Sequence, residues 1–145
     1  MMALPAFAVE YGEPDITPQT TMGEIRSNPS ILGAGIWTYS KEQNLPGTED
    51  WCNDQTLEKY VSSHVAQDCA DGLNLLIRNY NAGVQITYKL YSPEEIAAQP
   101  SRDHAELYYF PADTPNARYA VVLSGNALYY SGELRGGVST AWELH

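Results

Sequence analysis

Residues 71–91, DGLNLLIRNYNAGVQITYKLY, change from a helical to a strand pattern within one run. The first half spaces apolar residues three and four positions apart, which aligns them on one face of a helix: Leu73, Leu76, Ile77 and Tyr80. Asp68 or Asp71 can cap the start of this helix, and Gly83 stands where a left-handed residue ends one. The second half alternates apolar and polar residues up to Ser92, which is typical of a half-buried strand.

Upstream of this run, the sequence predicts a second helix that forms a hairpin with the first. From Asp54 onwards apolar side chains again recur at helical spacing, in the order Leu57, Tyr60, Val61, His64 and Val65. Residues 1–28 show no sustained apolar period, so an irregular N-terminal arm is expected there. The chain therefore divides into this arm, a helical segment over 29–83 and a C-terminal part over 84–145.

Downstream, the pattern alternates between short helices and strands. Ser92-Pro93-Glu94-Glu95 combines a cap, a proline at the first helical position and a carboxylate three after the cap, so a short helix should run to about Ala98. Strands are predicted over 105–110 and 119–123, and the second is continuously apolar, as a central strand would be. A final helix is predicted over 138–145. The sequence thus indicates an α/β class.

Length and charge limit what the chain can be. Its 145 residues suffice for one domain, and its composition is that of a globular protein. Residues 1–75 hold 11 acids and 3 bases (net -8), whereas 76–145 hold 7 and 5 (net -2). A total of -10 repels nucleic acid, and the longest apolar stretch is too short to cross a membrane.

The compartment stays open from the sequence. Ala6-Phe7-Ala8 resembles the cleavage end of a signal peptide, although the basic region and long apolar run that should come first are missing. The alternative is a loose terminus, which the spacing of the prolines also favours. Secreted or cell-envelope and cytoplasmic locations are therefore both compatible with these residues.

The two cysteines also leave two interpretations. Cys52 and Cys69 have no CxxC spacing and no histidine close enough in sequence to complete a zinc site, so no metal is expected. In an exported chain, a Cys52–Cys69 disulfide would stabilise the fold by about 3 kcal/mol. In an intracellular chain, both would be buried small hydrophobic residues.

Residues 84–145 carry a family resemblance. It rests on Thr87–Ala97 (TYKLYSPEEIA), on Leu107–Pro111 (LYYFP) and on the predicted strand 119–123 running into a glycine loop. In these features the chain resembles the N-terminal part of an α/β-hydrolase of the bacterial esterase and acetyl-xylan-esterase-like kind. The resemblance implies a partial α/β-hydrolase sheet of three strands, the first two an antiparallel edge pair, with the first crossover helix starting at Val138.

The resemblance also implies a chemistry, carboxylic ester hydrolysis by a serine nucleophile. In such enzymes backbone N–H groups of a glycine loop stabilise the oxyanion of the tetrahedral intermediate, and that loop corresponds here to Gly125, Asn126 and Ala127. The family has three consecutive glycines where this chain has one. The nucleophile, acid and histidine of the family follow later in chain order and have no counterpart here, so the expectation is a truncated hydrolase that needs no cofactor.

Other candidate residues have a functional and a structural interpretation. Gly137–Ala141 is close to a nucleophile elbow around Ser139, but the strand that must precede an elbow is not predicted, so an ordinary helical serine is favoured. His64 and His104 are interpreted as core or surface histidines. The acids beside Trp51 are interpreted as a solvated helix start rather than a sugar-cleaving pair: Glu49, Asp50 and Asp54.

Two expectations concern partners. The 11 tyrosines and 3 tryptophans suggest an alternative function, a secreted carbohydrate-binding module without catalysis. On the hydrolase interpretation the substrate of the completed protein is a small-molecule or carbohydrate ester. An incomplete sheet would leave strand 119–123 with an open edge, which predicts self-association.

Overall fold

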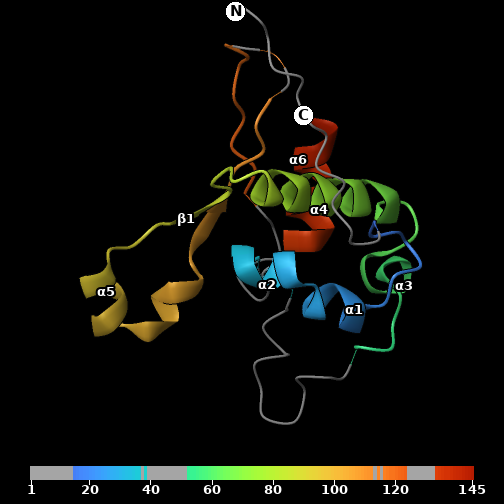
Figure 1. Cartoon of the computed structure of the whole chain (residues 1–145), viewed down its shortest axis with the longest axis horizontal. Helices are drawn as coiled ribbons and strands as arrows, with labels where there is room; N and C mark the ends of the chain where they lie inside the picture. The colour runs from blue at the N-terminus through green and yellow to red at the C-terminus, as the bar shows by residue number, and fades with distance from the viewer. Residues whose placement is uncertain (1–14, 37, 39–51, 113, 115, 124–132) are drawn as a thin grey trace, which may run out of the picture.

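The structure is a computed structural model, and it describes residues 15–36, 38, 52–112, 114, 116–123 and 133–145. Within these ranges the chain is a mixed helical and β structure in which helices predominate. Figure 1 shows the long helix α4 (Ala66–Asn81) crossing the centre, with the N-terminal helices on one side of it and the C-terminal helix α6 (Ser139–Glu143) beside it. No helix of the described part is long and apolar enough to span a membrane.

Helix α4 is the centre of the core, as its sequence pattern predicts. Leu73, Leu76 and Ile77 are buried, and Gly83 beyond its C-terminus adopts φ +79, which confirms the left-handed residue expected there. The start differs from the expectation, because Val65 occupies the cap position and Asp68 lies in the first turn. A π-helical turn, η3 (Glu133–Val138), leads into α6, and both pack along α4.

The end of the predicted N-terminal arm is helical. Helix α1 (Met22–Ser27) begins at a capping box in which Thr21 and Glu24 bond each other's backbone N–H groups. Helix α2 (Pro29–Ala34) follows at once, capped by the Asn28 side chain. Both helices bury apolar residues in the common core, namely Met22, Ile25, Ile31 and Ala34, and α2 packs against α4. The expectation of an irregular lead-in up to residue 28 is therefore wrong from Thr21 onwards, since local caps and burial of one face offset the weak periodicity.

The predicted helix after Asp54 is shorter than expected. Helix α3 (Leu57–Val61) ends at Ser62, whose φ of 98 no helix accommodates, and the chain turns before α4 begins. Leu57 and Val61 are buried as predicted, whereas the turn carries His64 out to an exposed position. The two helices contact each other, so the predicted hairpin exists with a short first member.

A two-stranded arm leaves the helical core. Strand β1 (Thr87–Lys89) pairs antiparallel with β2 (Glu106–Tyr108), and Tyr88 stands opposite Leu107. Between them lie α5 (Pro93–Ala98), which starts at the predicted capping box of Ser92 and Glu95, and the 3-10 helix η2 (Pro100–His104). Figure 1 shows α5 and η2 at the outer end of this arm, away from the helices. We call residues 87–110 the arm.

The third predicted strand is absent. Residues 119–123 form no regular secondary structure, and Tyr119, Val121 and Leu123 are 92%, 66% and 87% exposed. The described part of the chain therefore holds a sheet of two strands only, and the expected three-stranded α/β-hydrolase sheet is not formed in it. The physical reason is that a strand needs hydrogen-bonded neighbours for its backbone groups, and within the described part of the chain residues 119–123 make no backbone hydrogen bond.

Candidate functional site

The residues expected to form an oxyanion hole, Gly125, Asn126 and Ala127, lie outside the described residues. So do Glu49 and Asp50 of the acidic group beside Trp51. Asp54, the third member, is exposed in the turn before α3, where a solvated acid at a helix start was expected.

Ser139 is not on a nucleophile elbow. It is buried as the first residue of α6, and the π-helical turn η3 precedes it where an elbow requires a strand. Helix α6 packs against α4, and Val138 and Trp142 approach Gly72 of α4. The expected position of Ser139 in the first turn of a helix is confirmed.

The structure joins one histidine to a serine that sequence spacing did not single out. Ser62 Oγ lies 3.2 Å from His64 Nδ1 in the exposed turn between α3 and α4. Ser62 has φ 98 and ψ 151, a region that non-glycine residues avoid and that is often found at functional positions. A serine nucleophile also requires a group that orients the histidine, and within the described ranges no hydrogen bond reaches His64 Nε2. The contact therefore lacks the third group of a catalytic arrangement and links two residues of the same turn.

The backbone of His104, the other histidine weighed from the sequence, closes the 3-10 helix η2 on the arm. It precedes β2, as the sequence predicts.

Neither cysteine forms a disulfide in the structure, and both are buried. Arg26 donates from Nη2 to Cys52 Sγ over 3.0 Å and from Nη1 to Asn53 Oδ1 over 2.7 Å, so Cys52 belongs to a polar group beneath α1. Cys69 lies on the buried face of α4, and burial, with a smaller effect of the neighbouring Asp68 carboxylate, raises the pKa of its thiol to about 12. In the structure both cysteines are therefore small buried side chains without a disulfide, and their state in the protein stays a prediction.

We expect neither cysteine to react with a thiol reagent in the native protein at pH 8. The thiolate is the reactive species, and Cys69 with a pKa of about 12 is almost entirely protonated there, while Cys52 is shielded by burial. Titration with 5,5′-dithiobis(2-nitrobenzoate) checks this: two thiols should appear after unfolding in guanidinium without reductant. Failure to release any thiol on unfolding would instead indicate the disulfide.

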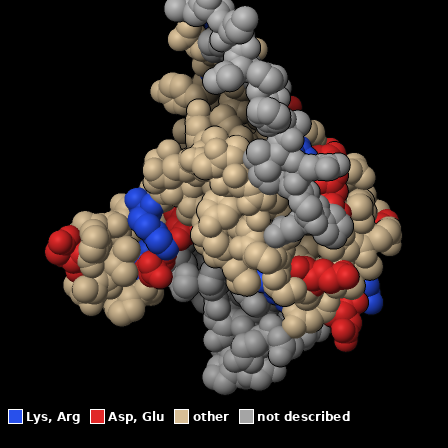
Figure 2. All heavy atoms as spheres, in the orientation of Figure 1, with Lys and Arg blue, Asp and Glu red and all other residues tan. Residues whose placement is uncertain are grey.

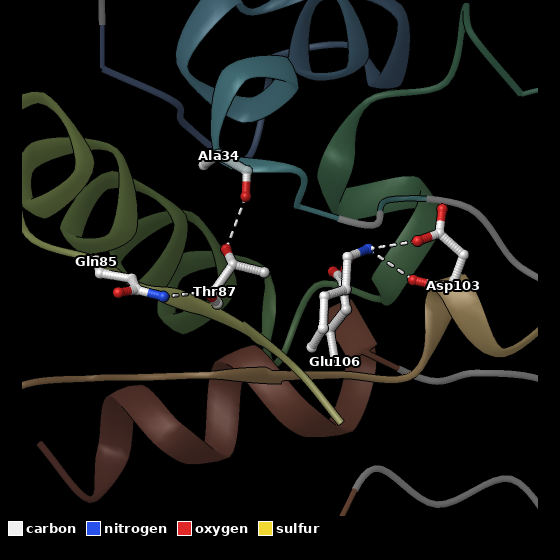
Figure 3. Close-up of polar contacts among 6 residues, drawn as sticks. Ala34, Gln85, Thr87, Asp103 and Glu106 are labelled. Carbon is white, nitrogen blue, oxygen red and sulfur yellow. Dashed lines mark hydrogen bonds and ion pairs between the residues drawn. The ribbon is translucent and has the colours of Figure 1, made fainter. Parts of the chain in front are cut away.

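An ion-pair cluster of Lys89, Asp103 and Glu106 joins the two strands of the arm. Sequence reasoning did not predict it. Lys89 Nζ donates to the backbone carbonyl of Asp103 over 2.6 Å, lies 3.2 Å from the Asp103 carboxylate and pairs with the buried carboxylate of Glu106 (Figure 3). Lys89 and Glu106 stand directly opposite each other in the β1–β2 register. From the sequence, this contact could have been predicted only by pairing the two strands in the correct register. The hydrogen bond to Glu106 is the main reason why the pKa of Lys89 is raised.

Replacing Lys89 by methionine should lower the free energy of unfolding, because Glu106 then stays buried without its cation. The pKa of Lys89 is raised on folding, so its contribution is fully present below its ordinary value of 10.5 and is lost as pH rises through the higher folded value. The difference between wild type and Lys89→Met in urea unfolding should therefore shrink above that pH.

Lys59→Met is the matched control for this measurement. Lys59 is exposed on α3, and the same change of charge there should alter the free energy of unfolding by less than about 0.5 kcal/mol. Equal effects of the two substitutions would show that the ion pairs of Lys89 contribute nothing to the free energy of unfolding.

The two faces of the arm differ in what they contact. On the inner face, the Thr87 hydroxyl donates to the carbonyl of Ala34 over 2.7 Å, and Tyr108 and Phe110 pack against the core. The register places the other side chains on the opposite face, where they are exposed: Tyr88, Leu90, Leu107 and Tyr109. We call these four residues the outer face. Figure 2 shows a mixed group of basic and acidic atoms where the arm meets the body and a separate acidic patch at its outer end, with uncharged surface between them.

No protein-family model matches the sequence, and neither a curated protein nor a solved structure shows significant similarity to it.

Proposed function

We propose that this chain supplies the front part of an ester-cleaving α/β-hydrolase scaffold and performs no ester cleavage alone. The single observation that carries the proposal is the antiparallel pairing of β1 with β2, the arrangement that the resemblance implies for the first two strands. Helix α6 adds support, because it begins at Ser139, next to the Val138 at which the crossover helix is expected.

The chemistry of ester hydrolysis determines which groups the complete protein must supply. Acyl transfer requires a serine activated by histidine and an acid, together with N–H groups that stabilise the oxyanion. In this proposal Gly125, Asn126 and Ala127 lie nearest the oxyanion, and the serine, acid and histidine come from polypeptide that is not in this chain. The reaction uses side chains and backbone amides, so the proposal includes no cofactor.

Two measurements test this proposal. The purified chain should neither turn over p-nitrophenyl acetate nor react with a fluorophosphonate probe. The reading frame downstream of the His145 codon should encode a strand, a G-x-S-x-G turn and later Asp and His residues, and co-expression of that segment should produce serine-dependent hydrolysis. Hydrolysis by the purified chain, abolished by changing one of its own serines, would overturn the proposal.

A second candidate function is a binding module without catalysis. It is favoured by the outer face, where Tyr88 on β1 and Tyr109, the residue after β2, are both exposed and could stack on a sugar. Retention on a polysaccharide resin tests it, with Tyr88→Ala and Tyr109→Ala expected to abolish retention. Tyr80→Ala, a half-exposed tyrosine on α4, is the control that should leave retention unchanged.

A further inference from the structure

The arm contributes little to the apolar core. Among its described residues no apolar side chain is fully buried, and only Tyr108 and Phe110, near its inner end, pack against the core from a partly buried position. Helix α5 buries no residue. Fully buried apolar side chains lie instead on the helices, as Leu73 and Leu76 of α4 do. Because burial of apolar surface is the main favourable term in folding, the helices hold most of the free energy that opposes unfolding.

The elements of the arm contact mainly one another. Among the described elements, β1 packs with β2 and α5 packs with η2, whereas α4 packs with the other helices. The ion pairs of Lys89 with Asp103 and Glu106 also lie within the arm. Figure 1 shows the arm extending away from the helices. An isolated two-stranded hairpin is at best marginally stable in water, so the arm depends on its attachment to the helices.

A hydrogen bond to α2 lies at the inner end of the arm. The Thr87 hydroxyl donates to the Ala34 carbonyl over 2.7 Å (Figure 3). Ala34 is the last residue of α2 and Thr87 is the first residue of β1. Ile86, directly before the arm, is buried in the core, which fixes the point where the chain leaves the helices. The Thr87–Ala34 bond therefore joins the arm to the helices next to this fixed point.

We propose that residues 87–110 open and close as one cooperative unit while the helices stay folded, and that the Thr87–Ala34 hydrogen bond favours the closed form. Opening breaks the β1–β2 pairing and this bond, and it uncovers two partly buried aromatic side chains. The packing of α4 against the other helices is kept. Units of this kind open at a lower free energy than the whole protein, and segments that move during binding are drawn from them. The proposal depends on neither of the proposed functions.

Native-state hydrogen exchange of the full chain, measured by NMR at increasing urea below the unfolding transition, tests the proposal. The amides of Leu90 and Tyr109 report on the arm, because they donate to the carbonyls of Ala105 and Ile86 on the opposite strand. The amide of Leu76 reports on α4. The two arm amides should share one opening free energy and one urea dependence. Both values should be smaller than those of Leu76, because the urea dependence scales with the surface that opening exposes.

A substitution in the helices separates the two units. The hydrogen bonds of Asn74 stay intact when only the arm opens. Asn74→Leu should therefore speed the exchange of Leu76 and leave that of Leu90 and Tyr109 unchanged. Gly72→Ala, which crowds the contact of α4 with α6, should give the same pattern and serves if Asn74→Leu fails to fold.

Substitutions of Thr87 test the hydrogen bond to α2. Thr87→Val keeps the branched shape but cannot donate, so the arm amides should exchange about fivefold faster, the effect of one net hydrogen bond. The bond is also lost in global unfolding, so an α4 amide that exchanges by that route should accelerate by the same factor. Thr87→Ser keeps the hydroxyl and is the matched control, with arm exchange expected within about twofold of the wild type.

Several results would each overturn the proposal. Equal opening free energies for the arm and α4, or faster arm exchange in Asn74→Leu, would show that the whole molecule opens as one unit. Different urea dependences of Leu90 and Tyr109, or exchange of both at the rate of an unstructured peptide, would show that the arm is no cooperative unit. Equal effects of Thr87→Val and Thr87→Ser would show that the hydrogen bond to Ala34 does not favour the closed form.

Discussion

Gly72→Ala should destabilise the protein by up to about 2 kcal/mol, although alanine is the better helix former by about 1 kcal/mol. Gly72 lies inside α4 where η3 and α6 cross it. A Cβ atom there would stand 2.7 Å from Val138 Cγ1 and 3.1 Å from the Val138 carbonyl oxygen. The first contact is shorter than real Cβ atoms show, and overpacking of this kind costs about 1 to 3 kcal/mol, which outweighs the gain in propensity.

Urea unfolding followed by circular dichroism measures this loss, and a double-mutant cycle assigns its cause. Val138→Ala removes the closest obstructing methyl, so the double variant should lose less stability than the sum of the single losses. Additive losses would show that the two residues do not obstruct each other. A more stable Gly72→Ala protein would show that α6 does not pack on α4 as closely as described.

Helix α4 and the arm show what local patterns can predict. The apolar face of α4 and the glycine beyond its end could be predicted from the sequence, because both depend on residues within a few positions of each other. The capping box of Ser92 and Glu95 is equally local, and α5 starts there. The same signal stands at Thr21 and Glu24, where the absence of a longer apolar period hid a helix of only six residues.

Tyr119–Leu123 shows where local patterns fail. A continuous apolar run favours a buried strand, but burial and pairing depend on distant segments that the run itself does not specify. The candidate sites have the same limit. The Lys89–Glu106 pair requires the register of two strands, and the Ser62–His64 contact requires a backbone conformation at Ser62 that serine rarely adopts.

Loss of the buried hydrogen bonds of Asn74 should lower the free energy of unfolding strongly. Its side chain is buried in α4 and bonds both backbone groups of Ile16: Oδ1 accepts from the Ile16 N–H over 2.8 Å, and Nδ2 donates to the Ile16 carbonyl over 2.8 Å. Asn74→Leu should cost about 2 to 4 kcal/mol, because each buried backbone group left unsatisfied costs about 1 to 3 kcal/mol and the added apolar surface recovers part of it. Thermal or urea unfolding checks this value.

Asn74→Asp separates the lost hydrogen bonds from a simple change of shape. A carboxylate keeps the bond from the Ile16 N–H but sets a negative oxygen against the Ile16 carbonyl, whereas a protonated carboxyl donates as the amide does. Burial favours the neutral form, so the aspartate's folded pKa lies above its unfolded value of about 3.9, and the loss should be large at pH 7 and shrink as pH falls through the folded pKa. Gln67→Glu, the same change at an exposed position of α4, should show a small loss. An Asn74→Asp loss that is independent of pH would show that the Ile16 carbonyl does not need a donor from α4.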